Sequence, residues 1–323
     1  MNKIILLLLL QFFWTAGFSQ SLPFRSVGTP IQRTNLLVHW NAPKHPWPKT
    51  LWVYHMVPTK FSPTVISNLM ALGSFTEKDR TYSNTNGLIF GNGQNLSISF
   101  SIGEIEYSRG ENNWTTNLAK DVPGTNQLFQ LTADFLPKLG ISLSDLTKTE
   151  NGKPNIVFYN DVGSIYFQDN IWITNICARE VGFVRAVDGV EFRAGGNCLI
   201  DFGEHGQVNK ISLSWRSLEH DKSYPAATPE IIMKWMREGK AVQKRMLDKF
   251  GGETTIDWTT AKSVTIKKAI AYYWGEVFLG EREHRPIFPS WVHPFATLLA
   301  TVDTGHGNVD VEIDCPIIDE TKL

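Results

Sequence analysis

The sequence predicts an α+β fold, in which antiparallel sheets carry helices packed on one face. Two observations lead to this prediction. Three segments place apolar residues at helical spacing between a capping residue and a glycine, and the stretches between them alternate apolar and polar residues as strands do. The repeated pattern indicates two α+β modules, residues 20–150 and 151–323, which follow a signal peptide of residues 1–19. A polar, glycine-containing stretch at residues 148–154 is the expected boundary.

The composition is that of a globular protein. The chain has 323 residues, of which 42% are hydrophobic and 20% charged, enough apolar material for one large core or two smaller ones. This composition excludes a disordered or low-complexity chain. Because 31 Lys and Arg balance 32 Asp and Glu, the chain lacks the basic field that nucleic-acid binding requires. We therefore expect no nucleic-acid partner.

The first twenty residues have the features of a secretory signal peptide. Lys3 supplies a positive charge, residues 4–10 are all apolar, and the small residues Gly17 and Ser19 suit a cleavage site. The apolar stretch is shorter than the roughly 20 residues that a transmembrane helix needs. We expect a cleaved, secreted or periplasmic protein with no stable membrane span.

The three cysteines leave two alternatives open. Cys177 and Cys198 flank a predicted hairpin, and an exported chain can keep a disulfide there if the strand register lets the two sulfurs meet. With Cys315 the count is odd, so at least one thiol stays free. The alternative is three buried, unpaired thiols that pack as small apolar side chains.

The first predicted helix begins at Ser62-Pro63 and ends at Gly73. Ser62 is a favoured capping residue, and proline is favoured at the first helical position. Val65, Leu69 and Leu72 then recur at helical spacing.

The second predicted helix begins near Thr125 and ends at Gly140. Its apolar residues share one face: Leu128, Leu131, Phe135 and Leu139. Pro137 should distort or shorten the last turn, because proline clashes with the preceding turn of a helix.

The third predicted helix begins at Thr228-Pro229-Glu230 and ends at Gly251-Gly252. One apolar stripe is expected from Ile231, Trp235, Val242, Met246 and Phe250. The helix would also carry a net positive charge. This charge favours binding to an anionic partner or a membrane surface; alternatively, the charged residues simply keep the exposed face of the helix in water. The binding candidates on this surface are Lys240, Lys244 and Arg245.

The predicted strands lie between and after these helices. They are residues 96–100, 156–158, 165–167, 181–187, 198–202, 208–215, 264–273, 296–302 and 309–313. Asp188-Gly189 and Glu204-His205-Gly206 suit the hairpin turns of a meander.

Several phrases in the second half resemble a known group of proteins. They are Arg179-Glu180-Val181-Gly182-Phe183-Val184-Arg185, Asp188-Gly189-Val190, Cys198-Leu199-Ile200-Asp201-Phe202-Gly203, and Leu213-Ser214-Trp215-Arg216 before a proline-capped helix. This order of strands and turns over residues 155–315 resembles secreted bacterial proteins with PepSY-type modules. It is also similar to the extracytoplasmic regulators YycH and YycI. The resemblance implies a non-enzymatic inhibitor or sensor-binding regulator, although YycI keeps an N-terminal anchor where this chain has an expected cleavage site.

The common catalytic motifs are absent, so no catalytic residue, cofactor or metal ligand is predicted. The densest polar cluster is Glu281, Glu283, His284 and His293. The spacing of these residues matches no pattern of metal ligands. Asp310, Glu312 and Asp314 alternate with aliphatic residues, which places the three carboxylates on one face of a strand. That face is either simply solvent-exposed or a surface that binds cations or basic partners.

Tryptophans crowd one N-terminal region. Trp40, Trp47 and Trp52 lie close together in the sequence and could stack on sugars, anchor a protein partner, or be buried.

We therefore expect an exported, non-catalytic binding or regulatory protein of the bacterial envelope, with a protein or surface partner. The alternatives are an envelope glycan-binding protein that uses the segment from Trp40 to Trp52, and an unrecognised hydrolase near Glu283 and His293.

Overall fold

The structure is a computed structural model. It describes residues 28–31, 33–44, 46–110, 121–168, 171–193, 196–244, 246–247, 253–254, 256–275, 278–279, 286–287 and 291–318. The predicted signal peptide, the candidate Arg245 and the cluster from Glu281 to His284 lie outside the described residues.

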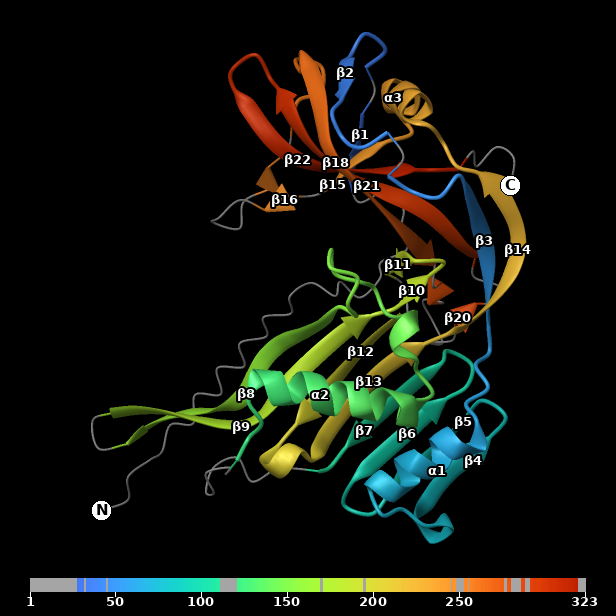
Figure 1. Cartoon of the computed structure of the whole chain (residues 1–323), viewed down its shortest axis with the longest axis vertical. Helices are drawn as coiled ribbons and strands as arrows, with labels where there is room; N and C mark the ends of the chain where they lie inside the picture. Colours follow the sequence, from blue (N-terminus) through green and yellow to red (C-terminus); the bar gives the residue numbers. More distant parts are fainter. Residues whose placement is uncertain are drawn as a thin grey trace.

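Two large sheets organise the molecule (Figure 1). The ten-stranded sheet contains β1 (Gly28–Pro30), β2 (Leu37–Trp40), β3 (Thr50–Val57), β10 (Ala186–Val187), β11 (Val190–Phe192), β14 (Ser217–Pro225), β15 (Val242–Lys244), β18 (Ser263–Gly275), β21 (Trp291–Asp303) and β22 (Asn308–Pro316). The eight-stranded sheet contains β4 (Arg80–Asn84), β5 (Gly87–Gly91), β6 (Asn95–Ser99), β7 (Glu104–Ser108), β13 (Val208–Trp215), β12 (Gly196–Phe202), β9 (Ile171–Val184) and β8 (Ile156–Gln168), in that spatial order.

The remaining elements are short. Two small hairpins pair β16 (Met246–Leu247) with β17 (Glu253–Thr254), and β19 (Phe278–Leu279) with β20 (Pro286–Ile287). The α-helices of the described chain are α1 (Pro63–Leu72), α2 (Thr125–Phe135) and α3 (Pro229–Arg237). Single 3₁₀ turns are η1 (Glu77–Asp79), η2 (Leu136–Leu139), η3 (Leu143–Asp145) and η4 (Glu204–Gly206).

The α+β prediction is therefore wrong. Over the residues described, strands predominate, α-helices number three, and two large sheets form a mostly β protein. The third helix is the main physical reason. It ends at Arg237 because Gly239, at φ 80°, closes it, with the Lys240 amide donating to the Trp235 carbonyl at 3.0 Å. The chain then continues as strand β15, so Val242 does not extend a helical stripe.

The first two helices begin and end as their sequences predict. The Ser62 hydroxyl accepts from the Val65 amide at 3.3 Å, and Pro63 starts α1. After α2, the turn that contains Pro137 is the 3₁₀ turn η2, and Gly140 closes it in the left-handed conformation at φ 76°. Gly73 has an ordinary φ of −98°, and glycine is needed there because a Cβ would lie 2.2 Å from the Phe75 ring.

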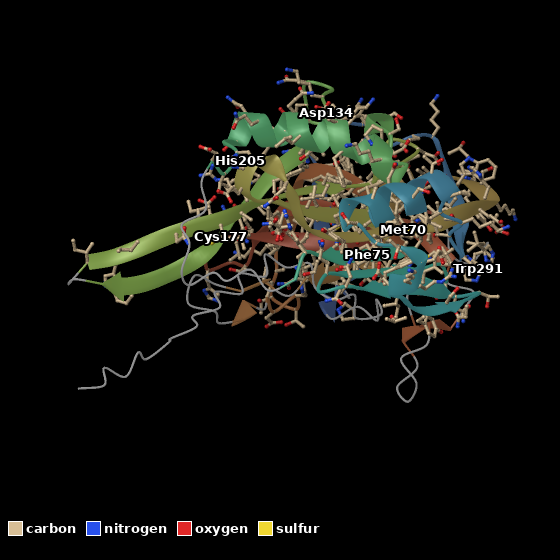
Figure 2. All side chains as sticks on the ribbon, turned by 90° about the horizontal axis from the view of Figure 1, so that it is seen from below. Met70, Phe75, Asp134, Cys177, His205 and Trp291 are labelled. Carbon is tan, nitrogen blue, oxygen red and sulfur yellow. The ribbon has the colours of Figure 1, made fainter. Side chains whose placement is uncertain are left out.

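Each large sheet has its own core. Val65, Leu69 and Leu128, from α1 and α2, join Ile98 and Ile200 in the core of the eight-stranded sheet. Both views show these two helices over one face of that sheet (Figures 1 and 2). A second core lies between α3 and the ten-stranded sheet, with Ile232, Trp235, Leu298 and Ile313 among its members.

The sheets are interleaved in the sequence. β7 pairs with β13, which places strands from both sides of residues 148–154 in one sheet. Strands leave the eight-stranded sheet for the other sheet at two single residues, Arg185 between β9 and β10 and Arg216 between β13 and β14. We call these two residues the crossover arginines.

The hairpin of β8 and β9 extends beyond the body of the molecule (Figure 1). It is one long hairpin, whereas the sequence predicted two separate short strands at residues 156–158 and 165–167. β12 pairs with β9 only over Arg179–Val184, so residues 162–168 and 171–178, which we call the arm, form a two-stranded ribbon, and no other described strand pairs with it.

Candidate functional site

The candidate site is a groove between α1 and α2 at one end of the eight-stranded sheet. It encloses about 460 Å³, within the range of small-molecule sites. Apolar and aromatic side chains form much of its lining: Leu72, Tyr107, Leu131, Phe135, Phe202 and Val208. Polar and charged residues complete it: Ser74, Gln94, Arg109, Asp134, Lys138 and Gln207. We call this feature the helix groove, and Figure 2 shows Asp134 on the helix above the sheet.

The wall of the helix groove near α1 is held by hydrogen bonds. The Tyr107 hydroxyl donates to the Gln94 amide oxygen at 2.7 Å, and the Gln94 amide nitrogen donates to the Gly73 carbonyl at 3.3 Å. The chain from α1 enters the groove at Ser74, a non-glycine residue at φ 53°. These contacts join the end of α1 to β7 and so fix the width of the groove at this side.

The opposite wall depends on a glycine. Gly206, in η4, has φ 75°, and a Cβ there would lie 2.9 Å from a Leu131 methyl group of α2. A side chain at residue 206 would therefore require the Leu131 side chain to shift, and the positive φ would strain it. The turn that the sequence predicts at Glu204-His205-Gly206 thus lies against the Leu131 side chain of α2.

The helix groove has an excess of positive charge. Arg109 and Lys138 are both exposed, and neither forms an ion pair with any residue that the structure describes, although Lys138 lies 5.8 Å from the Phe135 ring centroid. The charge of Arg109 opposes the effect of burial, which raises the pKa of Tyr107. Asp134 is the acid of the lining, and its carboxylate accepts from Gln130 at 2.9 Å. The groove therefore suits a ligand that combines an apolar part with an anionic group.

The crossover arginines carry buried charge at the junction of the sheets. Arg216 is 5% exposed; its Nη1 donates to the Met56 sulfur at 3.3 Å, and its Nε has no hydrogen-bond partner among the described residues. Arg185 donates to the Arg216 carbonyl, and its guanidinium lies 5.0 Å from the Trp215 ring centroid. Burial lowers the pKa of both arginines. Packing against aromatic rings and sulfur, rather than ion pairing within the described chain, holds these charges.

A pair of carboxyl groups lies on the other face of the eight-stranded sheet. Glu180 and Asp201 are opposite each other on β9 and β12, with Lys210 opposite Asp201 on β13. Burial, followed by the charge of Glu180, raises the pKa of Asp201 from 3.8 to about 7. Burial also raises the pKa of Glu180. Around pH 7 Asp201 is therefore partly protonated, whereas an ordinary aspartate is fully ionised.

The tryptophan candidates do not form one exposed patch. Trp40 and Trp47 meet edge to face at 6.3 Å, and their ring N–H groups donate to the carbonyls of Pro43 at 3.1 Å and Ala227 at 3.0 Å. Both also pack against the core of the ten-stranded sheet. Trp52 is 37% exposed and lies against the His220 ring, so it is separate from that pair.

The basic candidates do not share a helix face. Lys240 follows α3 and lies 5.0 Å from the Trp235 ring centroid. Lys244 is on β15, where its Nζ lies 3.4 Å from a Glu312 oxygen and 3.3 Å from an Asp314 oxygen. The predicted acidic strand thus supplies partners for the predicted basic surface. Asp310 pairs with Lys267 at 3.1 Å.

All three cysteines are buried, and no disulfide joins any two of them. Cys198 is opposite Phe183 in the sheet, six positions from Cys177, so the register holds the two sulfurs apart. Burial raises the pKa of both thiols. Of the cluster around residue 284, only His293 is described. Its Nδ1 is buried and has no hydrogen-bond partner in the part of the chain that the structure describes, and burial lowers its pKa.

Sequence reasoning missed the helix groove and the arm. The groove residues come from segments that the sequence does not connect, whereas the arm left a readable pattern: residues 162–178 contain one charged residue, Asp169. No protein-family model matches the chain, and no curated protein matches it. Within the described ranges, no helix has both the length and the apolar character that crossing a membrane requires.

Proposed function

We propose that this protein is an exported, non-catalytic binding protein of the bacterial cell envelope, and that it holds a small amphipathic acid in the helix groove. The observation that carries this proposal is the combination of an apolar lining with two cations, Arg109 and Lys138, that lack carboxylate partners in the described chain. The predicted signal peptide supports export. The resemblance to PepSY-type and YycI-like modules over residues 155–315 stays a prediction and favours regulation through binding.

The glycan-binding alternative has less support. A sugar-stacking patch needs exposed aromatic rings. The N–H groups of Trp40 and Trp47 donate to backbone carbonyls, and both rings pack against the core of the ten-stranded sheet.

Three eight-carbon probes test the groove: octanoate, octanol and octylammonium. They share an apolar chain and differ in charge. Calorimetric titration should rank octanoate first, because a charge-assisted hydrogen bond contributes about 1.5–3 kcal/mol. Arg109→Gln should weaken octanoate binding by about tenfold or more and leave octanol binding nearly unchanged. Lys44→Gln, which removes an exposed cation from the loop between β2 and β3, is the matched control.

Equal binding of all three probes would contradict the anionic specificity. Binding that Leu131→Trp does not reduce would place the ligand outside the helix groove, because the larger side chain should fill that cavity.

A further inference from the structure

A second pocket lies at the end of α3, beside the ten-stranded sheet. Its volume is about 560 Å³, within the range of small-molecule sites. It forms where the turn before β2, the end of α3 and the loop before β18 meet, and α3 packs beside β2 here (Figure 1). The lining is entirely polar or charged: Arg33, Thr34, Asn35, Arg237, Glu238 and Thr259. We call this feature the arginine pocket, and it differs in this respect from the partly apolar helix groove.

The first arginine of the pocket is fixed by the loop before β18. The Arg33 Nη1 donates to the carbonyls of Ala261 and, at 3.4 Å, of Trp258. Both of these residues are buried in the core of the ten-stranded sheet. The Arg33 Nε donates to the Asn35 amide oxygen at 3.1 Å, whereas its Nη2 has no hydrogen-bond partner among the described residues. The guanidinium group is therefore held in place with donor capacity left over.

The second arginine is the last residue of α3. The Arg237 Nε donates to the Leu36 carbonyl at 3.1 Å, and neither of its Nη atoms has a partner in the described part of the chain. Arg33 and Arg237 are both partly buried, and neither forms an ion pair with a described carboxylate. Because backbone carbonyls already hold both side chains, a ligand would bind them with little further loss of conformational entropy.

The acids nearest to these arginines have partners of their own. The Glu238 carboxylate lies 3.6 Å from the Lys234 Nζ. The Asp257 carboxylate accepts from the Thr259 amide at 2.9 Å and from its hydroxyl at 2.6 Å. These hydrogen bonds, and then the charge of Arg33, lower the pKa of Asp257, although the two residues form no ion pair within the described ranges. The charge of Glu238 is therefore offset, and the two guanidinium groups remain open to an anion.

The free donors of the arginine pocket suit a phosphate group. A phosphate group offers three strong acceptor oxygens, one more than a carboxylate, and the planar fork of arginine binds phosphate through two parallel hydrogen bonds. The Asn35 amide nitrogen is a further donor of the lining, because its amide oxygen already accepts from Arg33. The volume exceeds what one phosphate group fills, and the polar lining favours a hydrophilic remainder whose hydroxyls pair with Thr34 and Glu238.

We propose that the arginine pocket binds the phosphate group of a hydrophilic phosphate ester, with Arg33 and Arg237 donating to its oxygens. This site goes beyond the helix groove and does not depend on the ligand proposed there. A free phosphorylated polyol or sugar and a lipid headgroup share this chemistry, and the experiment separates the two sources.

Calorimetric titration with glycerol phosphate tests the site. At constant ionic strength, glycerol phosphate should bind at least about tenfold more tightly than acetate. Arg237→Gln should weaken glycerol phosphate binding by about tenfold or more, because it removes charge-assisted hydrogen bonds. Lys60→Gln is the matched control, since it removes an exposed cation from the segment before α1, on the other sheet.

Asn35→Asp separates binding from folding. Asn35 is exposed, and an aspartate has nearly the same shape and keeps the acceptor for the Arg33 Nε. The added carboxylate should repel phosphate and weaken its binding by about tenfold or more. Urea unfolding should show no loss of stability in this variant. It therefore tests the site even if Arg237→Gln weakens the contact between α3 and Leu36.

Vesicle sedimentation identifies the source of the phosphate. A lipid source predicts that the protein sediments with phosphatidylglycerol vesicles and that Asn35→Asp stays in solution, whereas a soluble source predicts glycerol phosphate binding without sedimentation. Absence of both overturns the proposal, and so does binding that Arg237→Gln and Asn35→Asp leave intact or that acetate matches. Phosphate binding that Arg109→Gln abolishes would place the anion in the helix groove and also overturn it. Octanoate binding is measured separately, so either site can fail alone.

Discussion

The carboxyl pair of Glu180 and Asp201 makes folding depend on pH in an unusual direction. A carboxyl group whose pKa is raised in the folded state stabilises the protein at low pH, and this contribution is lost as pH rises from the unfolded pKa to the folded pKa. For Asp201 that window runs from 3.8 to about 7. If Asp201 titrated alone, the full effect would be roughly 4 kcal/mol, and sharing the proton with Glu180 reduces it.

Asp201→Asn should therefore flatten the fall in stability between pH 4 and pH 8 and raise the free energy of unfolding at pH 8 by about 2 kcal/mol. Urea unfolding at several pH values measures this. Glu219→Gln, which changes an exposed carboxylate on β14, should leave the slope as in the wild type. An unchanged slope in Asp201→Asn would show that the pair does not hold the extra proton.

Other residue-scale features could not be read in advance. A sequence shows that Arg185 and Arg216 each follow an apolar strand. Their burial depends on which distant strands β10 and β14 pair with, and no local pattern encodes that pairing. Lys244 is a similar case, because the strand that brings it to Glu312 and Asp314 lies about seventy residues later in the chain.

Helix α1 is the element whose stability depends most clearly on a single local contact. Ser62→Ala removes the acceptor for the Val65 amide and should cost about 1 kcal/mol of folding free energy. Ser67→Ala, at an exposed position inside the same helix, should be neutral or slightly stabilising, because alanine is the better helix former. Denaturant unfolding of the two variants compares them, and equal losses would show that the cap contributes nothing specific.

Elements with local signals were predictable, and those with competing signals were not. Ser62-Pro63, Pro137 and Gly140 each act within one helical turn, so α1 and α2 follow from them. In the third helix, the apolar spacing that includes Val242 predicted a longer helix, whereas Gly239 predicted its end. The helix ends before Gly239. The helix groove depends on α2, β7 and η4 meeting in space, which no local pattern encodes.

At the scale of the whole molecule, the interleaved sheets predict a single unfolding transition. β7 pairs with β13, and the chain passes between the sheets at single residues, so neither sheet keeps its strands if the other unfolds. Calorimetry should show one transition, and separately expressed residues 20–150 and 151–323 should both be unfolded. Two resolved transitions, or a folded fragment, would instead favour independent modules on either side of residues 148–154.

The pairing of the first strands with late ones also sets the order of events when the protein is made. β1 pairs with β15, β2 with β18, and β3 with both β14 and β21. The N-terminal strands therefore leave the ribosome long before their partners exist, and contacts so distant in sequence form slowly. Until β21 is synthesised, these apolar segments lack their partner strands and are natural targets for a holding chaperone.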